Sequence, residues 1–170
     1  LVEGAVAPPV RDGSSIETTT VHVVGRGPLT DAVVAGLTPS ATVALRQSAL
    51  APAQLIVPEN EPGSDIAVLT DDMAPDPRVV TGLVRSRTPH LQVRLRDGVG
   101  IVGPLVLPGI TSCLRCADLT RGSLDPRWPH VSAQLLGRVG HASKPTVLAT
   151  AAVALAQIEA FVDGRHAPLA

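Results

Sequence analysis

TTVHVVGRGPLTDAVVAGL, residues 19 to 37, is the stretch that decides the fold of this 170-residue chain. Its first six residues are mostly β-branched, which is typical of a strand. The turn Gly25-Arg26-Gly27 follows, and from Pro28 onward the apolar residues recur at helical spacing. A strand, a glycine turn and a helix in this order predict the first unit of a parallel α/β sheet.

The rest of the chain continues the alternation of strands and helices. We expect strands at residues 42–46, 65–70, 90–96 and 99–107, and helices at residues 76–87 and 145–163. The strand at 65–70 is mostly apolar, which favours a parallel strand buried on both faces. The predicted fold is therefore α/β, a Rossmann-like, mainly parallel sheet flanked by helices, with added antiparallel strands near residues 90–107.

We expect this domain to span residues 18–170. Residues 1–17 are interrupted by Pro, Gly and Ser, so we interpret them as a linker or the remnant of a missing N-terminal region. Residues 51–63 are Pro-rich and too few for a comfortable crossover helix. This half of the sheet is therefore predicted to be abbreviated or irregular.

The composition argues against several kinds of partner. Fourteen basic and fifteen acidic residues give a net charge of −1, and one Trp, one Phe and no Tyr offer little for base stacking. We therefore expect no nucleic-acid partner. No run of about 18 apolar residues and no export signal is found, so no membrane span is expected. Two cysteines separated by two residues favour a cytoplasmic protein over a secreted protein held together by disulfides.

The glycine turn is the first candidate for a cofactor site. In nucleotide-binding units such a turn brings backbone amides to phosphate at a helix N-terminus, and Gly25 and Gly27 fit that role. Thr30 stands where a third glycine is usual, and no acidic residue ends the second strand to hold a ribose. Arg46 in that region suits a 2′-phosphate, which keeps an NADP-binding module open. A merely structural tight turn is the other interpretation.

Two carboxylates form the second candidate. Asp71 and Asp72 follow the strand at 65–70, at the edge where α/β sheets bind ligands. Carboxylates in this position can hold Mg²⁺ that bridges nucleotide phosphates, and Asp72 is the candidate catalytic residue. The alternative is an acidic turn and helix-capping cluster that includes Asp76.

Residues 18–164 resemble the ThiF/MoeB adenylating-enzyme superfamily, which is related to ubiquitin-activating enzymes, and the resemblance is more specific in their second half. A glycine turn, a strand ending in an Asp pair and a C-x-x-C motif occur in the superfamily's order. The narrower resemblance is to an actinobacterial subgroup of azole-peptide biosynthesis, called cyclodehydratase-domain or leader-peptide-binding proteins. It is carried by Gly103-Pro104-Leu105-Val106, Pro108-Gly109, Cys113-x-x-Cys116, Arg121, Asp125-Pro126, Trp128-Pro129 and Gln134-Leu135.

The departures from the superfamily pattern bear directly on function. The full glycine turn, the ribose-binding acid and the cations that handle ATP phosphates are missing, and Met73 stands where Asn follows the strand-end Asp. The resemblance therefore implies a degenerate scaffold that presents a precursor peptide to a partner cyclodehydratase, which carries the ATP chemistry. An active adenylating enzyme using Mg-ATP and an NADP-binding module are the alternatives.

Cys113 and Cys116 leave three interpretations open. Structural zinc needs four ligands, and the superfamily's second C-x-x-C is missing, so His130, His141 or a second subunit would have to complete the site. A redox pair and a vestigial thiol pair are the others. We also expect a homodimer, and we interpret the Trp128 segment and the hairpin stretch Pro104-Leu105-Val106-Leu107-Pro108 as a packing surface for a second copy or for a partner.

Overall fold

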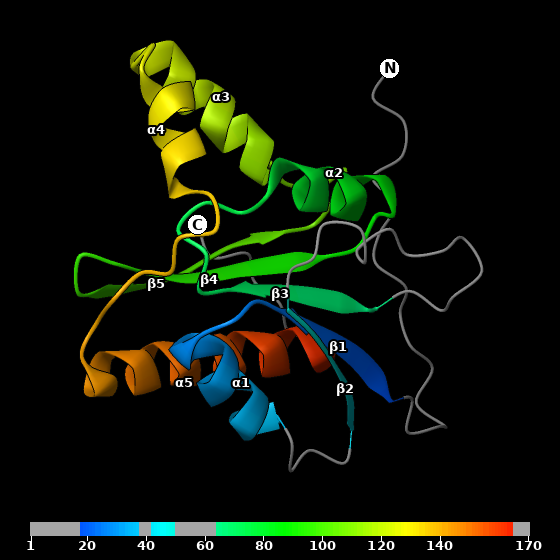
Figure 1. Ribbon diagram of the computed structural model, residues 1–170. Helices are drawn as coiled ribbons and strands as arrows, with labels where there is room; N and C mark the ends of the chain where they lie inside the picture. Colours follow the sequence, from blue (N-terminus) through cyan, green and yellow to red (C-terminus); the bar gives the residue numbers. More distant parts are fainter. Residues whose placement is uncertain (1–17, 38–41, 50–63, 165–170) are drawn as a thin grey trace, which may run out of the picture.

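The computed structural model describes residues 18–37, 42–49 and 64–164 of the chain, in which helices cover both faces of one sheet (Figure 1). The strands are β1 (Thr19–Val24), β2 (Val43–Ser48), β3 (Ile66–Thr70), β4 (His90–Arg96) and β5 (Val99–Val106). The helices are α1 (Pro28–Leu37), α2 (Pro77–Arg85), α3 (Leu114–Leu124), α4 (Trp128–Leu135) and α5 (Lys144–Val162).

The sheet has the order β2-β1-β3-β4-β5. β1 pairs in parallel with both β2 and β3, and β3 pairs in parallel with β4. β5 runs antiparallel to β4 after the tight turn at Asp97 and Gly98, both of which have positive φ. The expected Rossmann-like, mainly parallel sheet with an antiparallel pair is confirmed. β4 pairs in parallel with β3 and antiparallel with β5, so of the strands expected near residues 90–107 only β5 is an antiparallel addition to the sheet.

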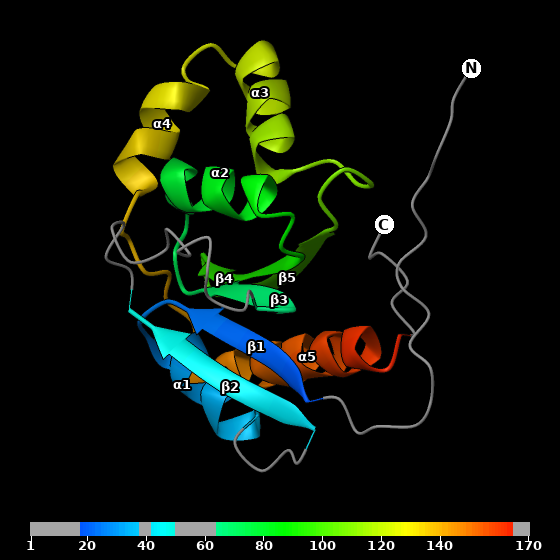
Figure 2. The same cartoon turned by 90° about the vertical axis from the view of Figure 1, so that its right-hand side faces the viewer.

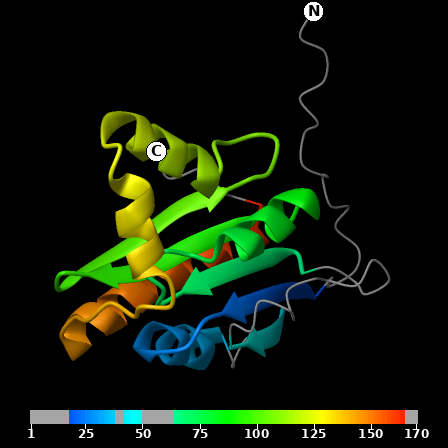
Figure 3. The same cartoon turned by 45° about the horizontal axis from the view of Figure 1, so that its top comes forward.

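Two layers of apolar packing hold the sheet between the helices. On one face, α1 and α5 lie against a core that includes Val21, Val68, Leu91 and Ile158. On the other face, α2 covers a smaller cluster of Val24, Ala67, Leu69, Val79, Val80, Leu83, Val106 and Leu114. The near-complete burial of β3 follows from its position at the centre of the sheet, with helices above and below (Figure 3).

α3 and α4 stand beyond α2, away from the sheet (Figure 2). Leu114 is the one buried residue of α3, and no residue of α4 is buried. The two helices instead expose the apolar side chains of Leu119, Leu124 and Val131. Neither helix was predicted from the sequence. Their apolar residues do not form the single continuous stripe by which a helix packed on a sheet is recognised.

α5 is the core helix of the α1 face. Its buried residues Val147, Ala151, Ala154 and Ile158 recur at helical spacing and pack against the sheet. By length and composition alone, α5 is also long and apolar enough to cross a membrane. The sequence contains no uninterrupted apolar run of about 18 residues here, because threonines, Gln157 and Glu159 lie among the apolar residues of the helix.

The predicted element boundaries agree with the structure to within about two residues. The strand expected at 90–96 is reproduced as β4, and the helix expected at 76–87 ends two residues earlier. That helix begins at Pro77 because the Asp76 carboxylate accepts the Arg78 N–H at 2.8 Å. The linker interpretation of residues 1–17 and the irregular segment expected at 51–63 lie outside the described residues.

Candidate functional site

The glycine turn joins β1 to α1 at the carboxyl edge of the sheet. Gly25 and Gly27 both have positive φ, at 156° and 149°. A Cβ at Gly25 would lie 2.3 Å from the Thr70 hydroxyl, and one at Gly27 would lie 2.7 Å from the Asp71 carboxyl carbon. Both glycines are therefore required by close contacts with the end of β3, whether or not a ligand binds at the turn.

Asp71 lies at the N-terminus of α1. Its Oδ1 accepts the Leu29 N–H at 3.1 Å, and its Oδ2 accepts the Thr30 N–H at 2.9 Å. The Thr30 hydroxyl donates to the same Oδ2 at 2.6 Å. The carboxylate is fully buried, and its backbone has the unusual φ of 67°. Asp71 thus occupies the position in which a helix N-terminus binds an anion.

This contact uses the donors that a phosphate would need. Pro28 opens α1 and has no N–H, so Leu29 and Thr30 supply the free amides of the first turn. Both amides donate to Asp71. A phosphate placed there would have to displace a buried carboxylate, and the two anions repel each other if both stay.

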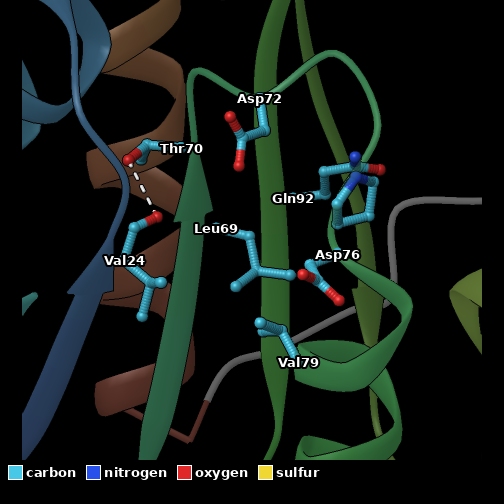
Figure 4. A pocket seen from close by; sticks show the side chains of 8 residues that line it. Val24, Leu69, Thr70, Asp72, Asp76, Val79 and Gln92 are labelled. Atoms are coloured by element: carbon cyan, nitrogen blue, oxygen red, sulfur yellow. Dashed lines mark hydrogen bonds between the residues drawn. The ribbon is translucent and has the colours of Figure 1, made fainter. Parts of the chain in front are cut away.

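Asp72 lines a pocket between the end of β3 and α2 (Figure 4). The pocket is lined by Val24, Leu69, Thr70, Asp72, Pro75, Asp76, Val79 and Gln92. Burial, reinforced by the nearby charges of Asp71 and Asp76, raises the pKa of Asp72 to about 6. The cavity volume is about 10 Å³, which is room for about one water molecule, whereas small-molecule sites usually span about 300–1,000 Å³.

The segment between α4 and α5 closes over the carboxyl end of β3. The Met73 N–H donates to the Arg138 carbonyl at 2.9 Å, and Asp72 forms an isolated antiparallel bridge with Val139. Further along, a Cβ at Gly140 would lie 1.8 Å from the Leu95 carbonyl oxygen. This cover was not predicted, because nothing local in residues 136–141 marks a partner so distant in sequence.

Arg46 lies on β2, in register with His22 of β1. His22 Nε2 and the Ser48 hydroxyl are 2.9 Å apart, and burial together with the Arg46 charge lowers the pKa of His22. The Gly25 N–H donates to the Ser48 carbonyl at 3.1 Å, so the glycine turn lies beside Ser48, two residues beyond Arg46. The Arg46 side chain is exposed on the strand, short of the turn where a cofactor phosphate was expected.

Cys113 and Cys116 lie together at the start of α3. Their sulfur atoms are 3.2 Å apart, and both are free thiols. Hydrogen bonds from the Cys116 side chain and backbone lower the pKa of Cys113. Within the described residues, no group of three or more His, Cys, Asp or Glu side chains is placed to hold a metal. Neither His130 nor His141 therefore completes a zinc site with the pair in a single chain.

Trp128 packs inside the α3–α4 pair. Its ring lies 5.2 Å from the Arg121 guanidinium, and its Nε1 donates to Asp118 at 3.3 Å. The side chain is partly buried by these contacts. The role of Trp128 in a dimer stays a prediction, and the structure gives it a local role in joining the two helices.

The contact between Thr30 and Asp71 is the part of the site that the sequence did not reveal. From the sequence, Thr30 was interpreted as a residue that replaces the usual third glycine, and Asp71 was interpreted as one of two acidic residues that follow the strand. The positions of these two residues in the predicted fold could have indicated the contact. In a parallel sheet, the end of one strand lies beside the start of the helix that follows the neighbouring strand, so Asp71 after β3 lies beside Thr30 at the start of α1. A hydroxyl and an extra carboxylate in those two places form a hydrogen bond.

Solved structures with the same fold include two forms of MccB from E. coli. MccB with ATP gives a TM-score of 0.62 at 16% identity, and MccB with AMPCPP and MccA gives 0.64 at 16% identity. A heterocyclase in complex with substrate and cofactor gives 0.63 at 15% identity. No protein-family model and no curated protein matches the sequence.

These similarities show the fold. The matches cover 91% of this chain with MccB and 86% with the heterocyclase, but they span 58% and 20% of those proteins. MccB is a microcin C7 biosynthetic enzyme. The resemblance inferred from the sequence is therefore confirmed at the level of the fold, which this chain shares with MccB and the heterocyclase.

Proposed function

We propose that this chain is a degenerate ThiF-like domain of ribosomal peptide modification. In this role it presents a precursor peptide to an ATP-dependent cyclodehydratase and does not itself activate a carboxylate with ATP. Support for the peptide context comes from the shared fold, because the similar structures include MccB with MccA and a heterocyclase with its substrate. The observation that carries the loss of adenylation is the buried contact of Asp71 with α1.

Adenylation places two requirements on a binding site. Such a site has to hold the ATP phosphates on backbone donors while a cation offsets their charge. Here the α1 donors are satisfied by Asp71, and its carboxylate places negative charge where the phosphates would lie. The pocket beside Asp72 has room for about one water molecule. Both features favour a scaffold over an enzyme.

An active adenylating enzyme is the second candidate, and one observation favours it. Asp72 lies at the carboxyl end of β3, where the superfamily pattern places its magnesium-supporting acid, and its pKa of about 6 is unusual for a carboxyl group. The same pKa has a simpler cause, because Asp72 is half-buried beside two further acids. A carboxyl that is partly protonated near neutral pH is also a weaker magnesium ligand.

Exchange of labelled pyrophosphate into ATP separates the two candidates. An adenylating enzyme supplied with its acceptor peptide catalyses this exchange, since the step is reversible, whereas a scaffold does not. We expect no exchange above a no-protein control with the purified protein, Mg-ATP and synthetic full-length precursor peptides of the azole-modified class, which carry both the leader and the acceptor. We expect those labelled peptides to bind, as measured by fluorescence anisotropy. Exchange that disappears in Asp72→Ala would overturn the proposal.

A further inference from the structure

The cysteine pair at the start of α3 is not used by the proposed function. Cys113 is the residue that caps α3, and Cys116 lies in its first turn. Their Sγ atoms are 3.2 Å apart, and the Cys116 N–H donates to the Cys113 Sγ at 3.4 Å. Cys113 is partly exposed and Cys116 is exposed, so both thiols can be reached from solvent.

The backbone before α3 holds the pair in this arrangement. The Thr111 hydroxyl accepts the Leu107 N–H at 2.9 Å, and the Thr111 N–H donates back to the Leu107 carbonyl at 3.0 Å. Leu114, between the cysteines, is buried in the smaller core cluster. The start of α3 is therefore fixed against the sheet, while the remainder of the helix extends outward.

The geometry matches the requirements of disulfide formation. A disulfide needs its sulfur atoms to close to about 2.05 Å, with Cα atoms roughly 4.4–6.8 Å apart. A residue at the cap and one three positions later on a helix satisfy the second condition, and sulfur atoms at 3.2 Å need to approach by about 1 Å for the first. A side-chain rotation supplies that movement without a backbone shift.

The two sulfur atoms have different chemical roles. Cys113 lies at the helix N-terminus, where the helix dipole and the Cys116 N–H stabilise a negative charge on its sulfur. Its thiolate is therefore the attacking group. Cys116 is one turn further along and free to react second, as a resolving thiol does.

We propose that Cys113 and Cys116 form a dithiol–disulfide couple that exchanges with disulfides of the glutathione class. The Cys113 thiolate attacks one sulfur of oxidised glutathione, which forms a mixed disulfide and releases one glutathione thiolate. The Cys116 thiolate then attacks the Cys113 sulfur, forms the internal disulfide and releases the second glutathione. Two protein thiols lose two electrons and two protons, and one glutathione disulfide becomes two glutathione molecules.

The experiment equilibrates the purified protein in buffers of reduced and oxidised glutathione, followed by acid quenching, alkylation and intact-mass measurement. The chain has two cysteines, so each serine variant keeps a single thiol and its adduct is assigned without digestion. We expect the native chain to lose two hydrogens and take up no alkyl group at the oxidising end. We expect Cys116→Ser to retain one glutathione on Cys113, and Cys113→Ser to react roughly tenfold more slowly.

Two results would overturn the proposal. One is a native chain that keeps a stable glutathione adduct as Cys116→Ser does, because the second thiol then fails to resolve the first. The other is thiols that resist exchange until a chelator is added, with zinc in the purified protein at about half an equivalent or more. That result identifies a metal site completed by a second chain. Circular dichroism of both serine variants confirms that they remain folded.

Discussion

Replacing Asp71 by alanine tests the contact on which the functional proposal depends. The substitution removes the acceptor of the Leu29 and Thr30 amides and leaves both donors buried. An unsatisfied buried donor costs about 1–3 kcal/mol, and the Thr30 hydroxyl keeps a second partner in Thr70 at 2.8 Å. Alanine at a φ of 67° adds about 1 kcal/mol of backbone strain. The two unsatisfied donors and the strain together predict that Asp71→Ala destabilises the fold by about 3–7 kcal/mol.

Asp97 provides the matched control. It has a similar positive φ of 52° but lies in the exposed hairpin turn, where its side chain is 90% exposed and 3.8 Å from Arg96. Asp97→Ala therefore keeps the backbone strain and loses only a surface ion pair, for a total of about 1–2 kcal/mol. Urea unfolding followed by far-UV circular dichroism measures both variants. A difference below about 1 kcal/mol between them would refute the assignment of Asp71 as the buried cap of α1.

Two further predictions concern stability. Because the folded-state pKa of Asp72 is raised from 3.8 to about 6, its ionised carboxylate disfavours the fold, and this penalty grows from about pH 4 to about pH 6 and is complete above that pH. After allowance for solvent screening, we expect Asp72→Asn to stabilise the protein by about 1–2 kcal/mol at neutral pH and not at all at pH 3.5. Chemical denaturation at both pH values measures this, and equal stabilisation at both would contradict the assigned pKa. We expect Gly100→Ala to lower the free energy of unfolding by about 2 kcal/mol or more, because the new Cβ would lie 1.7 Å from the Thr150 hydroxyl. The control Gly122→Ala has open space in α3, so it should be neutral or stabilising. Similar melting temperatures for the two variants would rule out the close approach of β5 to α5.

The sequence predicted the sheet well because its strands are dictated by local patterns. β1 is mostly β-branched and ends at a glycine turn, and β3 is mostly apolar because it is buried on both faces. The Asp97-Gly98 turn fixed the hairpin register through its positive φ values. Each of these signals lies within the residues that form the element.

The sequence predicted less where a contact joins distant segments. Asp71 meets α1 across 41 and 42 residues of chain, and the 136–141 segment covers β3 through backbone hydrogen bonds that do not depend on side-chain identity. The helices α3 and α4 have few buried residues, so no apolar stripe marks them. The location of Gly25, Gly27, Asp71 and Asp72 at one edge was anticipated, but the use of Asp71 as a helix cap was not.

Asp71 occupies the α1 donors beside the glycine turn, so we expect that the turn does not bind nucleotide. Calorimetric titration of the purified protein with Mg-ATP, with NADP as a parallel ligand, tests this most directly. We expect no heat of binding from either nucleotide at concentrations up to about 1 mM, which corresponds to less than about 4 kcal/mol of binding free energy. Micromolar binding of Mg-ATP that is lost in Asp72→Ala would contradict the account and establish a working nucleotide site.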